Sequence, residues 1–356
     1  MIDLIEITPE LFPRLERFNT AFPNEERDAS FWNRRFQHWW LDNPARSPGR
    51  PMGWALLDPA AGVVGFVANI ALLFQWEGSL VPAATASTWR VLPAFRTQSF
   101  RLMMQLFRTE KQSILFGSTP NTTTAPLLVR SGFSPLPRVS TTRQMFILTA
   151  DQAKHSIIIN YLQKKKWTLP KTERPGFPNL HPILNFNQHP ACSLFPVFEV
   201  GQEMDRFWEK TASLFANTFV RSAEAIHWYS FLNPYYRKQL IYILAKDRLI
   251  GYFLGKMSPK TNLTIFRIVD FWFDPDALAY IPTALANLVQ LARCHHADMI
   301  LFPTLPAPLS HAVAACQSVT VEDSTPLGFY RVEWDFSRKM VAADSYISDL
   351  HGDSEI

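Results

Sequence analysis

Residues 87–101 read Ser-Thr-Trp-Arg-Val-Leu-Pro-Ala-Phe-Arg-Thr-Gln-Ser-Phe-Arg, and the first half of the chain can be arranged around them. The run from Ala83 to Val91 is extended, and Pro93 marks a turn. A short apolar strand at 113–117 and a helix ending near 131–133 come later. Between them, the spacing i, i+3, i+4, i+7 predicts a helix with one buried face, formed by Phe100, Met103, Met104 and Phe107.

The turn between strand and helix is basic, and it is predicted to bind an anion. The first N–H groups of a helix have no partner inside the helix, and the helix dipole adds partial positive charge there. Arg96 and Arg101 place two guanidinium groups in the same stretch. This combination favours a phosphate or pyrophosphate group at the turn.

The motif Val91-x-Pro93-x-Phe95-Arg96, the amphipathic helix, Asn121 and the closing Gly-Phe pair resemble the acyl-CoA core of the GNAT acyltransferase superfamily. In that family the turn reads Arg/Gln-x-x-Gly-x-Gly/Ala, and its backbone amides hold the pyrophosphate of coenzyme A. Here the two glycine positions are Ser99 and Arg101. Glycine allows close approach of a backbone to phosphate, so these side chains restrict the site.

The resemblance implies that an acyl-CoA, acetyl-CoA or another, is the acyl donor. The backbone near Val91 would polarise the thioester, and Asn121 would hold the pantetheine arm or, equally well, cap the helix that follows it. The alternative is that Arg96 and Arg101 are ordinary surface arginines on a degenerate fold. The residues implied in cofactor binding are Val91, Arg96, Thr97, Gln98, Ser99, Phe100, Arg101 and Asn121.

The pattern of the first half returns in the second half. Trp40 to Pro44 has a counterpart at Trp228 to Pro234, and the Val-Val-Gly-Phe of 63–66 has one in the Leu-Ile-Gly-Tyr of 249–252. Pro93 matches Pro275, and the Ile-Leu-Phe of 114–116 matches that of 300–302; the separations all lie between 182 and 190 residues. Steady offsets of this kind indicate a tandem duplication.

The fold class expected is therefore α+β, with two tandem GNAT-like domains. Each would be a mixed, mostly antiparallel sheet flanked by helices, closed by a strand at 141–148 in the first domain and at 332–336 in the second. The expected division is a domain at 1–150 with the candidate acyl-CoA site, a linker or insertion at 151–195, a degenerate second domain at 196–336 and a frayed polar tail at 337–356.

Two charged stretches help to decide which copy carries the activity. Asp274 and Asp276 stand where the first copy has its basic turn, and carboxylates there suit a helix start but repel a pyrophosphate. The second copy is therefore interpreted as a structural or acceptor-binding half. Lys164 to Lys166 is interpreted as a solvated face or linker, with a phosphate or membrane-surface contact as the alternative.

No catalytic acid or base can be assigned. Acyl transfer to an amine needs a base for the amine and an acid for the leaving thiolate. In this family a tyrosine often acts as the acid, yet all nine tyrosines follow residue 150, and Ala83 to Val91 holds no carboxylate. Each remaining candidate also has a structural interpretation: His38, Glu77, His227, Tyr235 and Tyr236.

Composition narrows the class of protein. Of 356 residues, 47% are hydrophobic, which suits buried cores, and the net charge of +4 is too balanced to indicate DNA. Three cysteines and an acidic N-terminus predict no disulfide framework and no signal peptide, hence a cytoplasmic protein. No stretch reaches the roughly 20 apolar residues of a membrane span. Cys294-His295-His296 cannot converge on one metal from a helix, so no metal is predicted.

The sequence thus predicts an acyl-CoA-dependent N-acyltransferase that acts on the amine of a small molecule, an amino sugar or amino acid, held between the two copies. One rival is a Fem-type aminoacyl transferase, which pairs two GNAT-like halves and uses aminoacyl-tRNA. The charge balance speaks against a tRNA groove. The other rival is a non-catalytic binding protein on the same fold.

Overall fold

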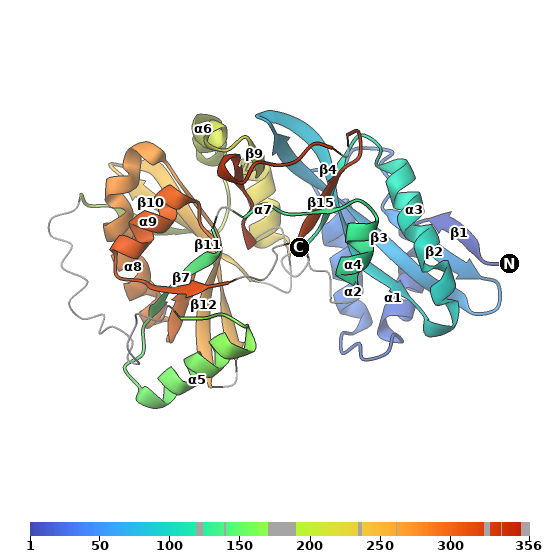
Figure 1. Ribbon diagram of the computed structural model, residues 1–356, viewed down its shortest axis with the longest axis horizontal. Helices are drawn as coiled ribbons and strands as arrows, with labels where there is room; N and C mark the ends of the chain where they lie inside the picture. Colours follow the sequence, from blue (N-terminus) through green and yellow to red (C-terminus); the bar gives the residue numbers. More distant parts are fainter. Residues whose placement is uncertain are drawn as a thin grey trace.

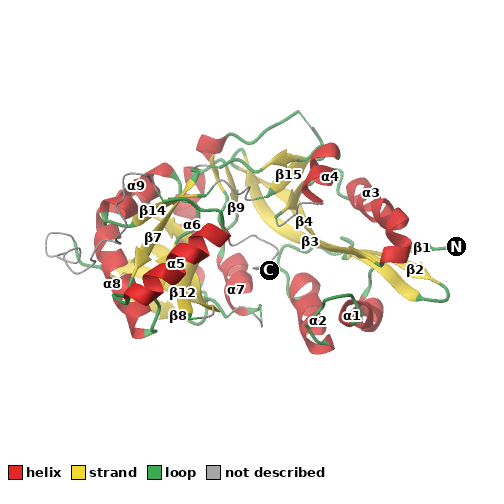
Figure 2. Ribbon diagram, turned by 60° about the horizontal axis from the view of Figure 1, so that its bottom comes forward, coloured by secondary structure: helices red, strands yellow, loops and turns green. Residues whose placement is uncertain are grey.

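The structure is a computed structural model, and it describes residues 1–118, 124–138, 140–169, 190–233, 237–260, 262–323, 328–335 and 337–349. Two lobes lie side by side, each built on one sheet (Figure 1). The first sheet lies between α1 and α2 on one face and α3 on the other (Figure 2). None of the helices in the described part of the chain combines the length and apolar content needed to cross a bilayer.

The first sheet has the order β1-β2-β3-β4-β5-β15-β6, and β9 and β16 extend it beyond β3. Its pairs are antiparallel except β4 with β5 and β9 with β16. Its strands are β1 (Asp3–Glu6), β2 (Gly53–Asp58), β3 (Gly62–Trp76), β4 (Ser79–Val91), β5 (Ile114–Gly117), β6 (Ser134–Pro135), β9 (Asn217–Phe219), β15 (Phe329–Val332) and β16 (Ser345–Tyr346).

The second sheet has the order β14-β7-β13-β12-β11-β10-β8, and its one parallel pair is β12 with β13. In the first sheet the pair β4 with β5 is likewise parallel and follows the long central strand, so the two sheets follow one plan. The strands are β7 (Thr142–Ile147), β8 (Ser193–Val197), β10 (Gln239–Ala245), β11 (Arg248–Lys260), β12 (Leu263–Phe273), β13 (Met299–Leu301) and β14 (Val319–Glu322).

The helices repeat in the same order in both halves. A 3-10 turn of equal length, η3 (Pro93–Gln98) or η5 (Pro275–Tyr280), leads into each central helix. Around Asp270 to Phe302 the second half has the same strand, helix, strand order as the first half has around its basic turn. The α-helices are α1 (Phe12–Thr20), α2 (Ala29–Phe36), α3 (Ser99–Thr109), α4 (Thr124–Arg130), α5 (Gln152–Lys164), α6 (Gln202–Thr211), α7 (Ala223–Phe231), α8 (Ile281–Cys294) and α9 (Ala307–Ala315).

Matching irregularities in the two sheets support the duplication. The pairing of β3 with β4 shifts register between Phe66 and Ala68, and that of β11 with β12 shifts between Leu254 and Gly255. A shift of this kind is a β-bulge, which bends and twists a strand. The two central strands therefore bend at corresponding places, just before the turns η3 and η5.

A glycine in the strand before each central strand, Gly65 opposite Val91 or Gly251 opposite Phe273, lets the two strands approach closely. A Cβ atom at Gly65 would lie 2.8 Å from Val91 Cγ2, and one at Gly251 would lie 2.4 Å from Phe273 Cδ2 and 2.9 Å from the Trp272 carbonyl oxygen. All three distances are shorter than non-bonded atoms tolerate. Gly65 and Gly251 therefore have the same role, which is to let two strands pack closely.

We expect Gly251→Ala to destabilise the protein by about 1–3 kcal/mol, because the new methyl group overpacks against Phe273 and the backbone. Urea unfolding would measure the loss. Gly117→Ala is the control, since its methyl group would meet only the end of the Leu128 side chain, which can move. Equal losses in the two variants would show that close strand approach is not the cause.

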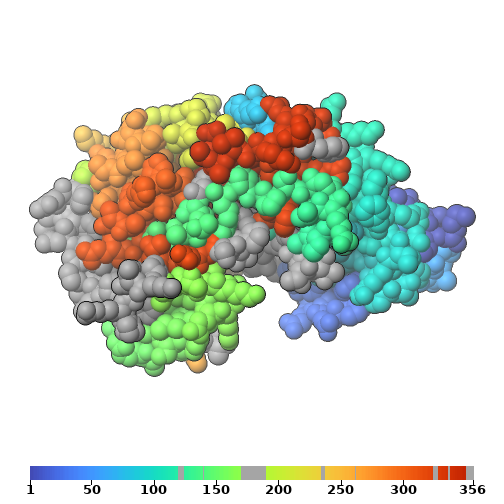
Figure 3. All heavy atoms as spheres, in the orientation of Figure 1, coloured from blue at the N-terminus to red at the C-terminus, as the bar shows by residue number. Residues whose placement is uncertain are grey.

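The last strands of the two sheets are exchanged, which corrects the sequence prediction. The strand expected to close the first domain at 141–148 is β7, and it lies between β13 and β14 of the second sheet. The C-terminal strand, expected at 332–336 in the second domain, is β15 at 329–332 and lies between β5 and β6 of the first. The described residues of 124–148, coloured green, extend from the first lobe to the second (Figure 3), whereas β14 of the second sheet is followed along the chain by β15 of the first.

The sequence could not show this exchange, because buried and exposed side chains alternate along a strand in the same way whichever sheet the strand joins. Met145, Phe146 and Ile147 are buried, but in the second lobe. Arg138 forms an ion pair with Asp323, which joins the two crossing connections. Each half of the chain, as divided at 150 and 196, therefore contributes one strand to the sheet of the other half.

Two further segments differ from expectation. The supposed linker contains α5, whose Ile158 and Leu162 are buried against the second sheet. The tail expected to fray is packed over 337–349: Tyr346 is fully buried, β16 pairs with β9, and Asp349 pairs with Arg143 and Arg267. The tail has few apolar residues, but these are enough to hold it in place because they lie where the two lobes meet.

Candidate functional site

The basic turn of the first copy is exposed and leads directly into a helix. The 3-10 turn η3 begins at Pro93, and α3 begins at Ser99. Ser99 has φ −56° and ψ −40°, so the serine at this glycine position needs no left-handed backbone. Its own N–H donates to the Arg96 carbonyl oxygen. The indole N–H of Trp89 donates to the Ser99 carbonyl oxygen at 3.2 Å and ties the strand to the helix start.

The side chains at this turn are available to a ligand. Arg96 and Thr97 are exposed, while Gln98 is half-buried. Arg101 donates to the Ile2 carbonyl oxygen at 3.2 Å and to Gln98 Oε1 at 2.9 Å, so it turns toward β1 and pairs with no described carboxylate.

The prediction for Phe100 was wrong in one respect. Its side chain is 56% exposed, and the buried face of α3 is instead Leu102, Met103, Leu106 and Phe107. Met103 and Phe107 lie on this face as predicted, whereas Leu102 and Leu106 occupy the places expected for Phe100 and Met104. An exposed phenyl ring beside the basic turn is accessible to a ligand. Asn121 lies outside the described residues.

The edge of β4 is open beside this turn. β4 pairs with β5 over Ala83 to Thr85 only, opposite Ile114 to Phe116. Beyond Thr85 the ladder with β5 does not continue, so within the described part of the chain the end of β4 at 88–91 has no strand partner on this side. An extended polar ligand could therefore form strand-like hydrogen bonds with this edge, which includes Val91.

The corresponding place in the second copy has different chemistry. Asp274 is buried, caps the helix start by accepting from the Asp276 N–H at 3.1 Å, and pairs with Lys210. Beside it, where β12 leaves β13, lies an apolar cavity of about 510 Å³ lined by Trp272, Phe273 and Leu278 among others. Acids at the turn and an apolar cavity behind it do not suit a pyrophosphate.

The catalytic candidates do not meet at either turn. Glu77 lies in the β3–β4 turn, where it pairs with Arg338 on the surface, and His227 packs against Phe231 with 5.4 Å between ring centroids. Tyr235 and Tyr236 lie outside the described residues. No described residue among these candidates is placed as the acid or base, and that assignment stays open.

His38 is a core residue. It is 1% exposed and stacks on Trp228 with 4.7 Å between ring centroids. Burial lowers the pKa of His38 to about 3, helped by the nearby charges of Lys238 and Arg35. At neutral pH the ring therefore stays uncharged, and its position between the lobes is structural.

We expect the protein to lose stability in acid because of His38. Below its ordinary pKa of 6.5 the histidine of the unfolded chain binds a proton, whereas the folded one stays neutral down to about 3. The free energy of unfolding should fall by about 1.4 kcal/mol for each pH unit in that window. Urea unfolding at pH 7 and 5 would measure it. His38→Phe should flatten the dependence and the exposed His295→Gln should not; the reverse would contradict the assignment.

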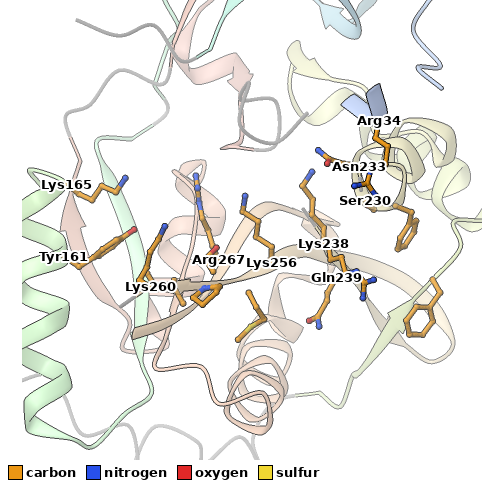
Figure 4. Close-up of a pocket in the computed structure, with 17 residues that line it drawn as sticks. Arg34, Tyr161, Lys165, Ser230, Asn233, Lys238, Gln239, Lys256, Lys260 and Arg267 are labelled. Carbon is orange, nitrogen blue, oxygen red and sulfur yellow. The ribbon is translucent and has the colours of Figure 1, made fainter. Parts of the chain in front are cut away.

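A cavity of about 1330 Å³ lies between the lobes. α2 of the first half contributes Arg34, and the rest comes from α5, α7 and the adjoining ends of β10, β11 and β12. Figure 4 shows basic side chains from these elements pointing toward a common space. Two of them, Lys238 and Lys256, are buried, and five more are reached by solvent: Arg34, Lys165, Arg237, Lys260 and Arg267.

Among the described residues that line this cavity, the charged side chains are all basic. No aspartate or glutamate is among the described residues that line it. Burial lowers the pKa of Lys165, and the neighbouring charges of Arg267 and Lys260 lower it further. Sequence reasoning missed this site. Its one signal was Lys165 in the lysine run, for which a phosphate contact was the alternative interpretation.

Comparison with known proteins identifies the fold. No protein-family model and no curated protein matches the sequence. A solved structure from Enterococcus faecalis V583, described as a probable N-acyltransferase, is 12% identical over 94% of this chain and 74% of its own, with a TM-score of 0.58. A GCN5-related N-acetyltransferase from Kribbella flavida is 15% identical over 94% and 72%, also at 0.58.

A third similar structure is the N-myristoyltransferase of Saccharomyces cerevisiae with bound myristoyl-CoA. It is 13% identical over 92% of this chain and 77% of its own, with a TM-score of 0.53. These likenesses cover nearly the whole chain, so both sheets are included. The chain has the GNAT fold, in a tandem α+β arrangement, and the prediction of that fold is confirmed.

Proposed function

We propose that the protein is an acyl-CoA-dependent N-acyltransferase, and that the first copy binds the acyl donor. The observation that carries the proposal is the edge of β4 at 88–91, which has no strand partner on its β5 side among the described residues and is followed by the basic turn Arg96 to Arg101. The edge suits the amides of a pantetheine arm, and the turn suits a diphosphate. The fold, shared with N-acetyltransferases and an N-myristoyltransferase, supports this donor class.

The chemistry proposed is attack of an amine nitrogen on the thioester carbon. The nitrogen–carbon bond forms as the carbon–sulfur bond breaks, the coenzyme A thiolate leaves, and the nitrogen loses a proton. Positioning alone contributes much to such a reaction, because thioesters react readily with a correctly held amine. Backbone N–H groups on the open edge near Val91 would stabilise the developing oxyanion. The acceptor would be a small-molecule amine.

Isothermal titration calorimetry against acetyl-CoA and longer acyl-CoAs tests the proposal. We expect saturable binding of at least one of them with a stoichiometry of one, since only the first copy has a basic turn. Failure of every acyl-CoA to bind would overturn the proposal in favour of a non-catalytic binding protein. A stoichiometry of two would show that the second copy binds as well.

A further inference from the structure

We propose that the apolar cavity of the second copy is a binding site for an uncharged molecule made largely of hydrocarbon. The cavity has a volume of about 510 Å³ and lies beyond Arg267, where the ladder between β12 and β13 ends. The described residues that line it include none of the first copy's basic turn. The site is therefore separate from the proposed acyl-CoA site, and the inference does not depend on the proposed function.

The lining of the cavity suits a hydrocarbon. Every described residue that lines it is a leucine, phenylalanine, tryptophan, proline or alanine. Water inside would find no polar side chain among them to bond, and an apolar void of this size loses packing contacts. The volume falls within the range of about 300–1,000 Å³ that is usual for ligand pockets. An apolar molecule would displace the water and restore the contacts.

The walls come from segments far apart in the chain. Leu214 lies in the 3-10 turn η4 (Ala212–Leu214), and Ala343 lies in the 3-10 turn η6 (Ala342–Asp344). The other walls are the end of β12, the turn η5 and the start of α9. Trp272 is 1% exposed, whereas Leu214 is 37% exposed. The cavity thus has a buried floor and a mouth that solvent reaches.

Trp272 forms a wall that is fixed in place without a ligand. Its indole N–H donates to Thr211 Oγ1 at 2.8 Å, so its one polar group is already satisfied. Tyr346 stacks on it with 5.7 Å between ring centroids, and the guanidinium carbon of Arg221 lies 4.1 Å from the ring. The Tyr346 hydroxyl in turn donates to the Phe271 carbonyl oxygen at 3.1 Å. A preformed wall lowers the entropy lost when a ligand binds.

The charges at the adjoining turn are paired, which disfavours an ionised ligand. Asp274 and Asp276 flank Pro275, which lines the cavity, and Lys210 pairs with both carboxylates. Arg248 lies 3.9 Å from Asp274. Two carboxylates thus face two cations at this turn. An ionised ligand would lose hydration here without gaining a free counter-charge, which costs free energy.

Isothermal titration calorimetry with 1-hexanol and 1-octanol tests the site. We expect saturable binding of 1-octanol at one site, roughly tenfold tighter than that of 1-hexanol, because two more methylene groups are buried. Octanoate and octylammonium should each bind at least about fivefold more weakly than 1-octanol. Tighter binding of either charged analogue would overturn the assignment to an uncharged ligand.

Ala343→Trp tests the place of binding. Its indole ring would occupy the cavity from the mouth, so 1-octanol should bind at least about tenfold more weakly. Ala279→Trp is the matched control, because Ala279 is also an exposed alanine in a 3-10 turn but lies outside the described lining. It should stay within about twofold. Leu278→Glu is the second variant, in case the first does not fold: it places a charge in the cavity and should abolish binding.

Other results would overturn the inference. One is no saturable binding of 1-octanol by the wild-type protein, or equal affinity for the two alcohols. An equal loss in Ala279→Trp would place the binding elsewhere. A dimer in size-exclusion chromatography that Ala343→Trp dissociates would assign the cavity to a second copy of the chain. Displacement of 1-octanol by a long-chain acyl-CoA would assign it to the acyl chain of the donor. Failure of every acyl-CoA to bind, with 1-octanol still bound, would refute only the proposed function.

Discussion

Arg96→Glu is expected to weaken acyl-CoA binding by at least roughly tenfold, because a charge-assisted contact with phosphate contributes about 1.5–3 kcal/mol. Arg96 is exposed in the last turn of η3, just after the end of β4. Reversal of its charge removes an attraction and adds a repulsion to the diphosphate. Calorimetry with the best acyl-CoA would measure the change in dissociation constant.

Two control variants address the second copy. Asp276→Ala changes the exposed acid at the corresponding turn, and Leu278→Glu places a charge in the apolar cavity behind it. Both should leave acyl-CoA affinity unchanged if the donor binds the first copy. A loss of affinity in Leu278→Glu, with none in Arg96→Glu, would move the donor site to the second copy.

Asp270→Ala is expected to destabilise the protein by about 3–5 kcal/mol, because it leaves a buried charge without its partner. Arg221 is 1% exposed and donates to both oxygens of Asp270, at 2.9 and 3.0 Å. The hydroxyl of Tyr252 also donates to Asp270, and Trp272 lies 4.1 Å from the guanidinium carbon of Arg221. Urea unfolding would measure the loss.

The comparison variant is Glu77→Ala, which breaks the exposed ion pair with Arg338. Exposed pairs contribute about 0–1 kcal/mol, so its effect should be small. A double variant, Arg221→Met with Asp270→Leu, removes both buried charges and should recover most of the stability. If the double variant is no more stable than Asp270→Ala, the loss comes from packing and not from the unpaired charge.

The sequence allowed the elements and their repetition to be predicted, because both depend on local patterns. Gly65 recurs as Gly251 in the second copy, and the turns η3 and η5 have equal length. The partner of a strand is different, since nothing within Thr142–Ile147 distinguishes one sheet from the other. Pairing of the last strands depends on contacts far apart in the chain, and these are not visible in a periodicity.

The same distinction between local and long-range information applies to the functional sites. The basic turn is continuous in sequence, so its exposure and its helix could be predicted from Pro93 to Arg101. The basic cavity is discontinuous: its cations come from positions between Arg34 and Arg267. The net charge of the whole chain is only +4, so the composition does not reveal this cluster of basic side chains. A cluster that forms only on folding leaves no run of charge to find.

The exchange of β7 and β15 has a consequence for how the protein is made. The first sheet begins at Asp3, but the gap between β5 and β6 is filled only by Phe329–Val332. At a synthesis rate of about 5–20 residues per second, roughly 10–40 seconds separate the emergence of β6 from that of β15. During that interval the first sheet carries an unfilled slot with free backbone groups, which other chains could enter. The N-terminal lobe therefore cannot mature at the ribosome ahead of the C-terminal one, and both are completed by the same late segment of the nascent chain.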